Sequence, residues 1–254
     1  MLIDSHAHLD DKKYGSVEKL LENFSAAGGG LLIDIGFDYD SSLSAKERAD
    51  KYPNVFFAAG YHPQEADKNN DNALIAALTA SDRCVAIGEI GLDYHYEPFD
   101  KNRQKELFVS QIALADECGL PIIIHSRDAS AEMLSILKEN SSYLKHGFLM
   151  HCYSESKEQA RNYLDLGAYF AFGGAITFKN AKKDDTIRYI PFDRLLAETD
   201  CPYMAPVPYR GNLNEPQYVS FVYDKFADIL GVGRAVVEEQ FEKNFFTFFK
   251  KARR

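Results

Sequence analysis

Short apolar segments recur along the whole chain, separated by longer segments in which apolar residues have helical spacing. We predict eight β-strands, at 2–5, 31–35, 55–60, 84–89, 121–125, 147–151, 168–173 and 195–199. Several of these strands are continuously apolar, for example FFAAG, VAIG and IIIH. Continuous apolar runs are typical of strands that are covered on both faces, as in a parallel sheet.

The segments between the strands predict helices with recognisable ends. In the first of them, Val17, Leu21 and Phe24 fall on one face, Ser16 is a suitable N-cap and Gly28 a suitable stop. The same kind of pattern recurs at 100–118, 156–166 and 233–250. A helix between consecutive strands is the usual connection in a parallel sheet.

Eight strands that alternate with helices in 254 residues predict an α/β fold of the (β/α)8 TIM-barrel type. A chain of this length suits a single domain over residues 1–254. The alternative is an open doubly wound sheet, which would need fewer strands. The chain has neither a GxGxxG motif nor a P-loop, which are phosphate-binding signatures of such sheets. We therefore favour the barrel.

Four histidines and two carboxylates stand where these predicted strands end. They are His6, His8, Glu89, His125, His151 and Asp200. In a parallel barrel the carboxyl ends of all strands share one rim, and this rim is where such folds build their active sites. We therefore expect the six side chains to lie together.

The first strand and its neighbour in a closed barrel supply three of these groups. His6 and His8 are two positions apart, so both imidazoles can point to the same side and bind one metal ion. Asp4 is a candidate acceptor behind one of these rings. Asp200 closes the eighth strand, faces the two histidines, and is the natural partner for a bound water. Glu198 is a second candidate acceptor.

The other three groups end the fourth, fifth and sixth strands. A buried glutamate such as Glu89 is costly unless it is paired or metal-bound, and its two oxygens can bridge two cations. A single histidine after an apolar strand is more often a packed core residue. Two of them on adjacent strands, His125 and His151, favour metal ligands.

Nitrogen and oxygen ligands without a thiolate suit Zn, Mn, Ni or Co, and four histidines argue against a site for Mg alone. We predict two divalent metal ions, with Zn, Mn and Mg as the candidates. Cys152 and Cys201 adjoin ligand positions, but strand alternation turns their side chains away from the rim.

Further residues near the predicted rim are candidates for contacts with a substrate. His62 in GYHP either touches the substrate or packs within a loop. Arg127 and Arg210 could each hold an anionic group. Three tyrosines that follow ligand strands could stack on a base or pack within a lid, namely Tyr94, Tyr153 and Tyr203.

The net charge and the spacing of the cysteines limit which binding partners and which cellular compartment we expect. A net charge of −9 argues against a protein that coats duplex nucleic acid, although a local site with bound cations could still hold a phosphate. The four cysteines form no CxxC pair, which indicates free thiols in a reducing compartment. With no signal sequence or bilayer-spanning run, the chain is predicted to be cytoplasmic and to make no membrane contact.

The chain resembles the TatD-type metal-dependent hydrolases, which belong to the amidohydrolase-like barrel superfamily. Six motifs carry the resemblance, in the order DSHAHLD, GYHP, IGEIGLDY, IIIHSRDA, MHCYS and LLAETDCPYMAP. Three further segments resemble family blocks, namely GGAITFKNAKK, YRGNLNEPQYV and the terminal NFF. The resemblance therefore extends over nearly the whole chain.

The resemblance implies a TIM barrel with a divalent metal centre and deoxyribonuclease activity, which in the family is 3′–5′ exonuclease action and in some cases cleavage at abasic sites. The expected partner is a single-stranded DNA end, and the expected assembly is a monomer. By motif, the ligands of a first metal ion match His6, His8, Glu89 and Asp200, and those of a second match Glu89, His125 and His151. Positions near a substrate phosphate match His62, Arg127 and Arg210.

Two departures from the family pattern keep alternatives open. Members often have a serine after the aspartate of ETD, where this chain has Cys201, and basic residues where it has Asn212 and Leu213. The second departure weakens the expected grip on a polynucleotide but leaves the metal chemistry intact. The alternative is an amidohydrolase-like enzyme acting on a small amide or ester, and a third hypothesis is a non-enzymatic barrel with a structural metal. Glu89, at a place where amidohydrolases often use a carboxylated lysine, favours the nuclease.

Overall fold

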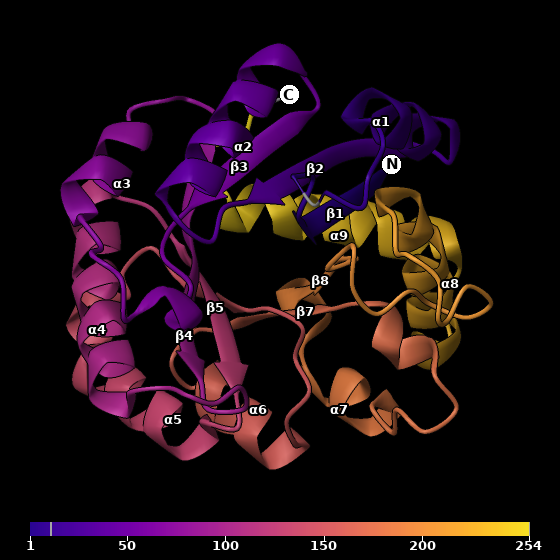
Figure 1. Ribbon diagram of the computed structural model, residues 1–254. Coiled ribbons are helices and arrows are strands. Elements are labelled where there is room, and N and C mark those ends of the chain that lie inside the picture. Colours follow the sequence, from indigo (N-terminus) through magenta and orange to yellow (C-terminus); the bar gives the residue numbers. More distant parts are fainter. Residues whose placement is uncertain (11, 254) are drawn as a thin grey trace.

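The computed structural model describes residues 1–10 and 12–253 and contains an eight-stranded parallel sheet whose strands follow one another in chain order (Figure 1). The strands are β1 (Leu2–Ala7), β2 (Gly29–Ile35), β3 (Val55–Ala59), β4 (Cys84–Asp93), β5 (Ile122–Arg127), β6 (Phe148–Met150), β7 (Tyr169–Phe172) and β8 (Leu195–Ala197). The segment after β8 returns to β1, because Ala7 and Cys201 form a parallel bridge and the His8 N–H donates to the Cys201 carbonyl at 2.9 Å. The predicted TIM barrel is confirmed.

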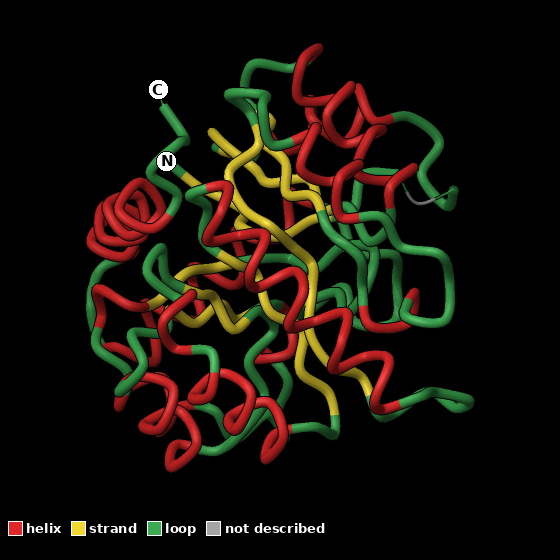
Figure 2. The backbone as a smooth tube through the Cα atoms, turned by 90° about the vertical axis from the view of Figure 1, so that its left-hand side faces the viewer, coloured by secondary structure: helices red, strands yellow, loops and turns green. Residues whose placement is uncertain are grey.

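Helices enclose the strands on the outside of the barrel (Figure 2). The α-helices are α1 (Val17–Ala26), α2 (Tyr39–Lys51), α3 (Asn72–Leu78), α4 (Lys101–Cys118), α5 (Ser130–Glu139), α6 (Lys157–Leu164), α7 (Asp184–Tyr189), α8 (Val219–Leu230) and α9 (Arg234–Phe248). Short 3-10 turns are η1 (Pro63–Glu65), η2 (Ser141–Tyr143), η3 (Gly174–Thr177), η4 (Phe192–Arg194) and η5 (Pro216–Tyr218). Within the described ranges, no helix is long and apolar enough to cross a bilayer.

The helix ends follow the local sequence signals. Ser16 Oγ accepts a hydrogen bond from the Lys19 N–H at 3.2 Å, which is the predicted N-cap of α1. Asp100 caps α4 in the same way, through the backbone N–H groups of Asn102 and Arg103. Side-chain oxygens thus satisfy donors that the first helical turn leaves unpaired.

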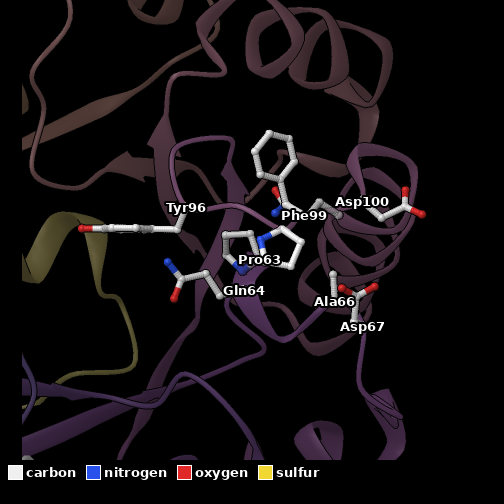
Figure 3. Close-up of a pocket in the computed structure, with 9 residues that line it drawn as sticks. Pro63, Gln64, Ala66, Asp67, Tyr96, Phe99 and Asp100 are labelled. Atoms are coloured by element: carbon white, nitrogen blue, oxygen red, sulfur yellow. The ribbon is translucent and has the colours of Figure 1, made fainter.

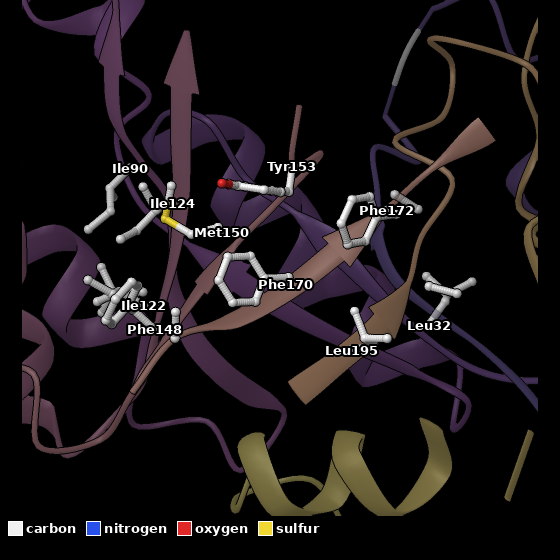
Figure 4. Close-up of a cluster of buried hydrophobic side chains, with 14 of the residues drawn as sticks. Leu32, Ile90, Ile122, Ile124, Phe148, Met150, Tyr153, Phe170, Phe172 and Leu195 are labelled. Carbon is white, nitrogen blue, oxygen red and sulfur yellow. The ribbon is translucent and has the colours of Figure 1, made fainter. Parts of the chain in front are cut away.

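Two apolar layers hold the barrel together. The larger one fills the space between the strands and the surrounding helices and includes Ile124, Phe148, Phe170 and Phe172 (Figure 4). The smaller one fills the inside of the barrel, where Ile33, Val85, Ile123 and Leu149 meet the end of α9. In the aromatic tail, the rings of Phe245, Phe248 and Phe249 are at most 3% exposed. The end of α9 therefore packs into the barrel.

Strand β4 departs from its predicted boundary. It continues four residues beyond Glu89 to Asp93, and its register against β5 shifts between Ile87 and Ile90. Such an irregularity re-aims a side chain, and here it falls on the glutamate. Gly91, with φ of 146°, lies so close to β5 that an added Cβ would be 2.0 Å from the His125 carbonyl oxygen. Glycine is therefore required where β4 passes His125.

Candidate active site

The six predicted ligands lie together at the carboxyl ends of the strands, with Glu89 at their centre. Its Oε2 is 3.4 Å from His6 Nε2 and 3.8 Å from His8 Nε2. Its Oε1 is 2.7 Å from His125 Nδ1 and 2.8 Å from His151 Nε2. One carboxylate therefore lies between two pairs of imidazoles, with one oxygen facing each pair.

Asp200 completes the cluster from the segment after β8. Its Oδ1 lies 3.8 Å from His6 Nε2 and 3.7 Å from His8 Nε2. Its backbone N–H donates to the His6 carbonyl at 2.9 Å, which explains why a residue 194 positions later in the chain faces the first strand. Burial is the main cause that raises the pKa of Asp200 to about 6, and the neighbouring His151 and His8 oppose this shift.

Hydrogen bonds on the far side of two rings determine which nitrogen faces the cluster. His8 Nδ1 is 3.1 Å from the Ile35 carbonyl, which can only accept, so Nδ1 carries the proton and the lone pair is on Nε2. His125 lies between two carboxylates, with Nε2 3.2 Å from Asp93 Oδ2 and Nδ1 2.7 Å from Glu89 Oε1. In each ring the outer acceptor can hold the proton while the nitrogen that faces Glu89 gives its lone pair to a cation. Such outer partners fix the orientation of metal-binding histidines.

The arrangement of these nitrogens fits divalent cations. His6 Nε2 and His8 Nε2 are only 3.3 Å apart, and the ring of His6 is fully buried. Burial is the main cause that lowers the pKa of His6 well below its usual value, so this ring does not become cationic to satisfy Glu89. Among the described residues, three groups of potential ligand atoms from this cluster each lie within 4.8 Å of one another, namely His6, His8 and Glu89, then Glu89, His125 and His151, and then His6, His151 and Asp200. Imidazole nitrogens with carboxylate oxygens form a donor set that Zn, Mn and similar cations accept.

His62 lies beside this cluster with a different proton arrangement. Its Nδ1 accepts the Gln64 N–H at 3.2 Å, so the proton of the neutral ring is on Nε2, which is 4.0 Å from Glu89 Oε1. Burial, followed by the proximity of His125, lowers the pKa of His62 to about 3. A fourth close group consists of His62, Asp93 and His125. We interpret these residues as hydrogen-bonding groups and not as a further metal site, because Asp93 Oδ2 is paired with His125 Nε2 at 3.2 Å and His62 Nδ1 already accepts the Gln64 N–H.

Asp93 is a functional residue that the sequence analysis missed. It is 2% exposed, and Oδ2 accepts hydrogen bonds from His125 Nε2 and from Gln64 Nε2, both at 3.2 Å. Burial opposes its charge, but the contacts from His125, the His95 N–H and Gln64 together lower the pKa of Asp93 to about 2. The sequence feature that could have identified Asp93 is its position in IGEIGLDY, four residues after Glu89 in a strand that continues beyond that glutamate.

The sequence predicted that Glu198 and Asp4 would each accept a hydrogen bond from a ligand histidine, and only Glu198 lies beside one. Glu198 Oε1 lies 3.5 Å from His151 Nδ1 and accepts the Cys152 N–H at 2.5 Å, so it lies behind a ligand ring as expected. Asp4 does not contact an imidazole. Its carboxylate accepts from the N–H and hydroxyl of Thr199 and from the backbone N–H of His6. Asp4 therefore joins β1 to the segment that carries Asp200.

The two arginines that were candidates for anion binding each pack against an aromatic ring. Arg127, at the end of β5, donates from Nη1 to the Tyr96 hydroxyl at 3.0 Å, and its guanidinium is 4.7 Å from the centre of that ring. Arg210, after β8, lies 4.3 Å above the Phe178 ring. These stacked positions limit the motion of two long cationic side chains.

The candidate tyrosines differ in how much ring surface they expose. Tyr153 is 5% exposed, packs edge-on against Phe170 and Phe172 and donates its hydroxyl to the Ser156 carbonyl (Figure 4). Tyr153 therefore has the packing role that the sequence left open, and its ring has no free face for a base. Tyr94 stacks on Phe99, with ring centres 5.4 Å apart, and is half-buried. Tyr203 is 52% exposed.

Asn214, in the NEP segment, is a second residue that the sequence analysis missed. Its side-chain amide donates to the carbonyls of Thr199 and Tyr203, at 2.8 and 2.6 Å, and the residue is fully buried. These bonds hold the turn that carries Asp200. An asparagine in a loop gives no local sign of such distant partners, so only the folded contacts reveal it.

Comparisons with known proteins identify the family of this chain and agree with its barrel fold. The family model of the TatD-related DNases matches residues 3–250. The chain is 44% identical over 233 residues to the uncharacterized metal-dependent hydrolase YabD of Bacillus subtilis, covering 90% of this chain and 91% of that protein. It is 38% identical over 253 residues to the uncharacterized metal-dependent hydrolase YcfH of Escherichia coli K12, covering 98% and 95%. The crystal structure of YjjV, a TatD homologue from Escherichia coli K12, superposes with a TM-score of 0.91 at 29% identity, covering 98% of each chain.

Proposed function

Because the chain belongs to the TatD-related DNase family, whose members are metal-dependent hydrolases, we propose that it hydrolyses phosphodiester bonds at the 3′ end of single-stranded DNA. The observation that carries this proposal is the position of Glu89 between the pair His6 and His8 and the pair His125 and His151. Two divalent cations held there would activate water and neutralise charge on a phosphodiester. We assign the ligand roles accordingly, with Asp200 on the side of His6 and His8.

The protein's own residues perform the proton transfer. Asp200 directs Oδ1 toward the nitrogens of His6 and His8, and we assign Oδ2 as the acceptor of the proton from the attacking water. Burial raises the pKa of Asp200 to about 6 in the metal-free protein, and a cation bound beside it would favour the charged form that accepts a proton. The buried Glu198 behind His151 keeps that ring in place during the reaction.

His62 and Arg127 bind the phosphate in this proposal. His62 stays neutral and offers an N–H at Nε2, so it donates a hydrogen bond to a phosphate oxygen without adding a charge. Arg127 adds a positive charge whose position the Tyr96 ring fixes. Arg210 is our candidate for a second phosphate, on the β8 side of the rim. Water attacks phosphorus, the bond to the 3′ oxygen breaks, that oxygen takes up a proton, and a nucleoside 5′-phosphate leaves.

The acidic surface restricts how the substrate is held. With a net charge of −9, the protein cannot gain much affinity from long contacts with a phosphate backbone. A strand end inserted at the rim needs few phosphate contacts, which supports a single-stranded terminus as the substrate. We propose a monomer, because Phe245, Phe248 and Phe249 at the end of α9 pack into the barrel and are not available to a partner chain.

The test is release of mononucleotides from a 3′-labelled single-stranded oligonucleotide by protein stripped of metal and then supplied with Mg, Mn or Zn. Glu89→Gln should abolish release, and Glu117→Gln, an equal change on the exposed face of α4, should not. Release that needs metal and Glu89 is the expected result. No release with any metal, from protein shown to bind cations, would contradict the proposal and favour a hydrolase of small amides or esters.

A further inference from the structure

A small cavity opens beside the phosphate-binding residues, between η1 and the loop that follows β4. Its volume is about 200 Å³, and its lining includes Pro63, Gln64, Asp67, Tyr96, Phe99 and Asp100 (Figure 3). Pockets for drug-sized ligands are typically about 300–1,000 Å³, so this one suits a fragment such as a single nucleobase. The described residues of the proposed metal centre do not line it.

Direct contacts join this cavity to the phosphate-binding groups. Gln64 donates its backbone N–H to His62 Nδ1 at 3.2 Å and its side-chain amide to Asp93 Oδ2 at 3.2 Å. The Tyr96 hydroxyl accepts the hydrogen bond from Arg127 at 3.0 Å. A phosphate held by His62 and Arg127 would therefore have the nucleoside attached to it next to this cavity.

The walls of the cavity provide an aromatic surface for stacking. Tyr96 is 55% exposed, and Figure 3 shows its ring and the Gln64 amide extending to the same side of Pro63. Phe99 and Pro63 form the apolar part of the wall. Nucleobases stack on exposed aromatic rings whatever their sequence.

The polar groups of the cavity are mainly hydrogen-bond acceptors. Gln64 uses its Nε2 for Asp93, which leaves Oε1 to accept. Asp67 and Asp100 contribute carboxylates. Asp67 Oδ1 accepts from Arg103 Nη1 at 3.1 Å and Asp100 Oδ2 lies 4.0 Å from Arg103 Nε, although the lining itself contains no lysine or arginine. Adenine and cytosine offer an exocyclic amino group to acceptors, whereas thymine offers a carbonyl oxygen at the same place.

We propose that this cavity binds the base of the 3′-terminal nucleotide and prefers bases that carry an exocyclic amino group. The proposal rests on the function proposed above, because the position of the base follows from a phosphate at His62 and Arg127. The base stacks on Tyr96, and its amino edge faces Gln64. The terminal base therefore contributes to affinity, in addition to its phosphate.

The experiment measures binding of reaction products to the metal-loaded protein by isothermal titration calorimetry. The ligands are dAMP, dCMP, dTMP and 2-deoxyribose 5-phosphate, which carries the same phosphate without a base. We expect dAMP and dCMP to bind on the order of tenfold more tightly than the sugar phosphate, as one stacked base contributes. We expect dTMP to bind more tightly than the sugar phosphate, because its base also stacks, but more weakly than dAMP and dCMP, because it offers no amino group to the acceptors.

Variants of one exposed residue test the location of the base. Tyr96→Phe keeps the ring and should keep the preference for dAMP over the sugar phosphate, whereas Tyr96→Ala should remove it. Tyr143→Ala is the control, because Tyr143 is 44% exposed in η2 before β6, at the opposite end of the barrel. Equal affinity of dAMP and the sugar phosphate in the unaltered protein would overturn the proposal, as would equal affinity of dTMP and dAMP, or an undiminished preference in Tyr96→Ala.

The calorimetric experiment and the nuclease assay test separate claims, so either claim can be refuted while the other stands. If DNA is hydrolysed but the base adds nothing to product binding, the base site is wrong and the nuclease function stands. If dAMP binds with the expected preference but no oligonucleotide is cleaved, the base site stands and the proposed hydrolysis of DNA is wrong.

Discussion

Asp93 should control how tightly the protein holds a divalent cation, although we do not assign it as a ligand. Its Oδ2 accepts the N–H of His125 Nε2 at 3.2 Å, and its pKa of about 2 keeps it charged at every working pH. This acceptor would hold the Nε2 proton of His125 while Nδ1, which is 2.7 Å from Glu89 Oε1, gives its lone pair to a cation. Asp93→Asn keeps the shape of the side chain but removes its charge.

The expected loss follows from the position of Asp93 behind a ligand ring. Removing such an outer carboxylate typically costs 10–100-fold in metal affinity, which corresponds to about 1.4–2.8 kcal/mol. The effect falls on one of the two proposed cation positions, because the other ring pair, His6 and His8, has no contact with Asp93 among the described residues. A competition titration against a coloured chelator measures both affinities.

Asp116→Asn is the matched control for this measurement. Asp116 Oδ1 is also close to an imidazole, His146 Nε2 at 3.8 Å, and its Oδ2 pairs with Lys145 at 2.9 Å. These residues lie at the amino ends of the strands, far from Glu89, so the control removes an equivalent charge without touching the rim. Unchanged affinity at both positions in Asp93→Asn, with an unchanged melting temperature, would refute the reasoning.

Three further changes test the catalytic, electrostatic and packing arguments. Asp200→Asn should keep the melting temperature and lower kcat by about 10²–10⁴-fold, the usual contribution of a general base; full turnover would remove Asp200 from the mechanism. Burial lowers the pKa of His62 to about 3, below its unfolded value of about 6.5. The unfolded state therefore takes up a proton that the folded state does not, so the stability of the metal-free protein should fall from pH 6.5 toward pH 3, and fall less steeply in His62→Asn. Equal slopes by urea titration at several pH values would contradict this. Tyr223→Phe removes a buried hydroxyl that accepts from the N–H and donates to the carbonyl of Ile3, both at 3.1 Å. Urea denaturation should give a loss of about 1–3 kcal/mol, and no loss would mean that water replaces the hydroxyl.

Local sequence was sufficient to predict the strands, the helix caps and the set of side chains at the rim. Continuous apolar runs such as IIIH identify strands because a buried strand needs apolar residues on both faces, whichever strands lie beside it. Ser16 and Asp100 identify helix starts because their oxygens bond to N–H groups two or three residues away. Strand direction then brings the polar residues that follow each run to the same end of the barrel.

The sequence was insufficient wherever a role depends on a partner far along the chain. Tyr153 and Tyr96 both follow strands of the site. Contacts with Phe170 and Phe172 bury the ring of Tyr153, whereas the ring of Tyr96 is 55% exposed. The sequence does not distinguish these two outcomes. The boundary of β4 was wrong because the shift against β5 that re-aims Glu89 is a property of strand pairing.

The sequence by itself thus determined the barrel and the residues of the proposed metal centre, since both follow from apolar periodicity and from the chemical type of the residue at each strand end. Only the tertiary structure decided the proton positions on His8 and His62, the placing of Asp93 behind a ligand ring and the cavity beside Tyr96. The physical reason is that a tautomer, a buried carboxylate and an open ring face each depend on which groups from other strands lie within hydrogen-bond or packing distance. Those distances are fixed when the barrel closes.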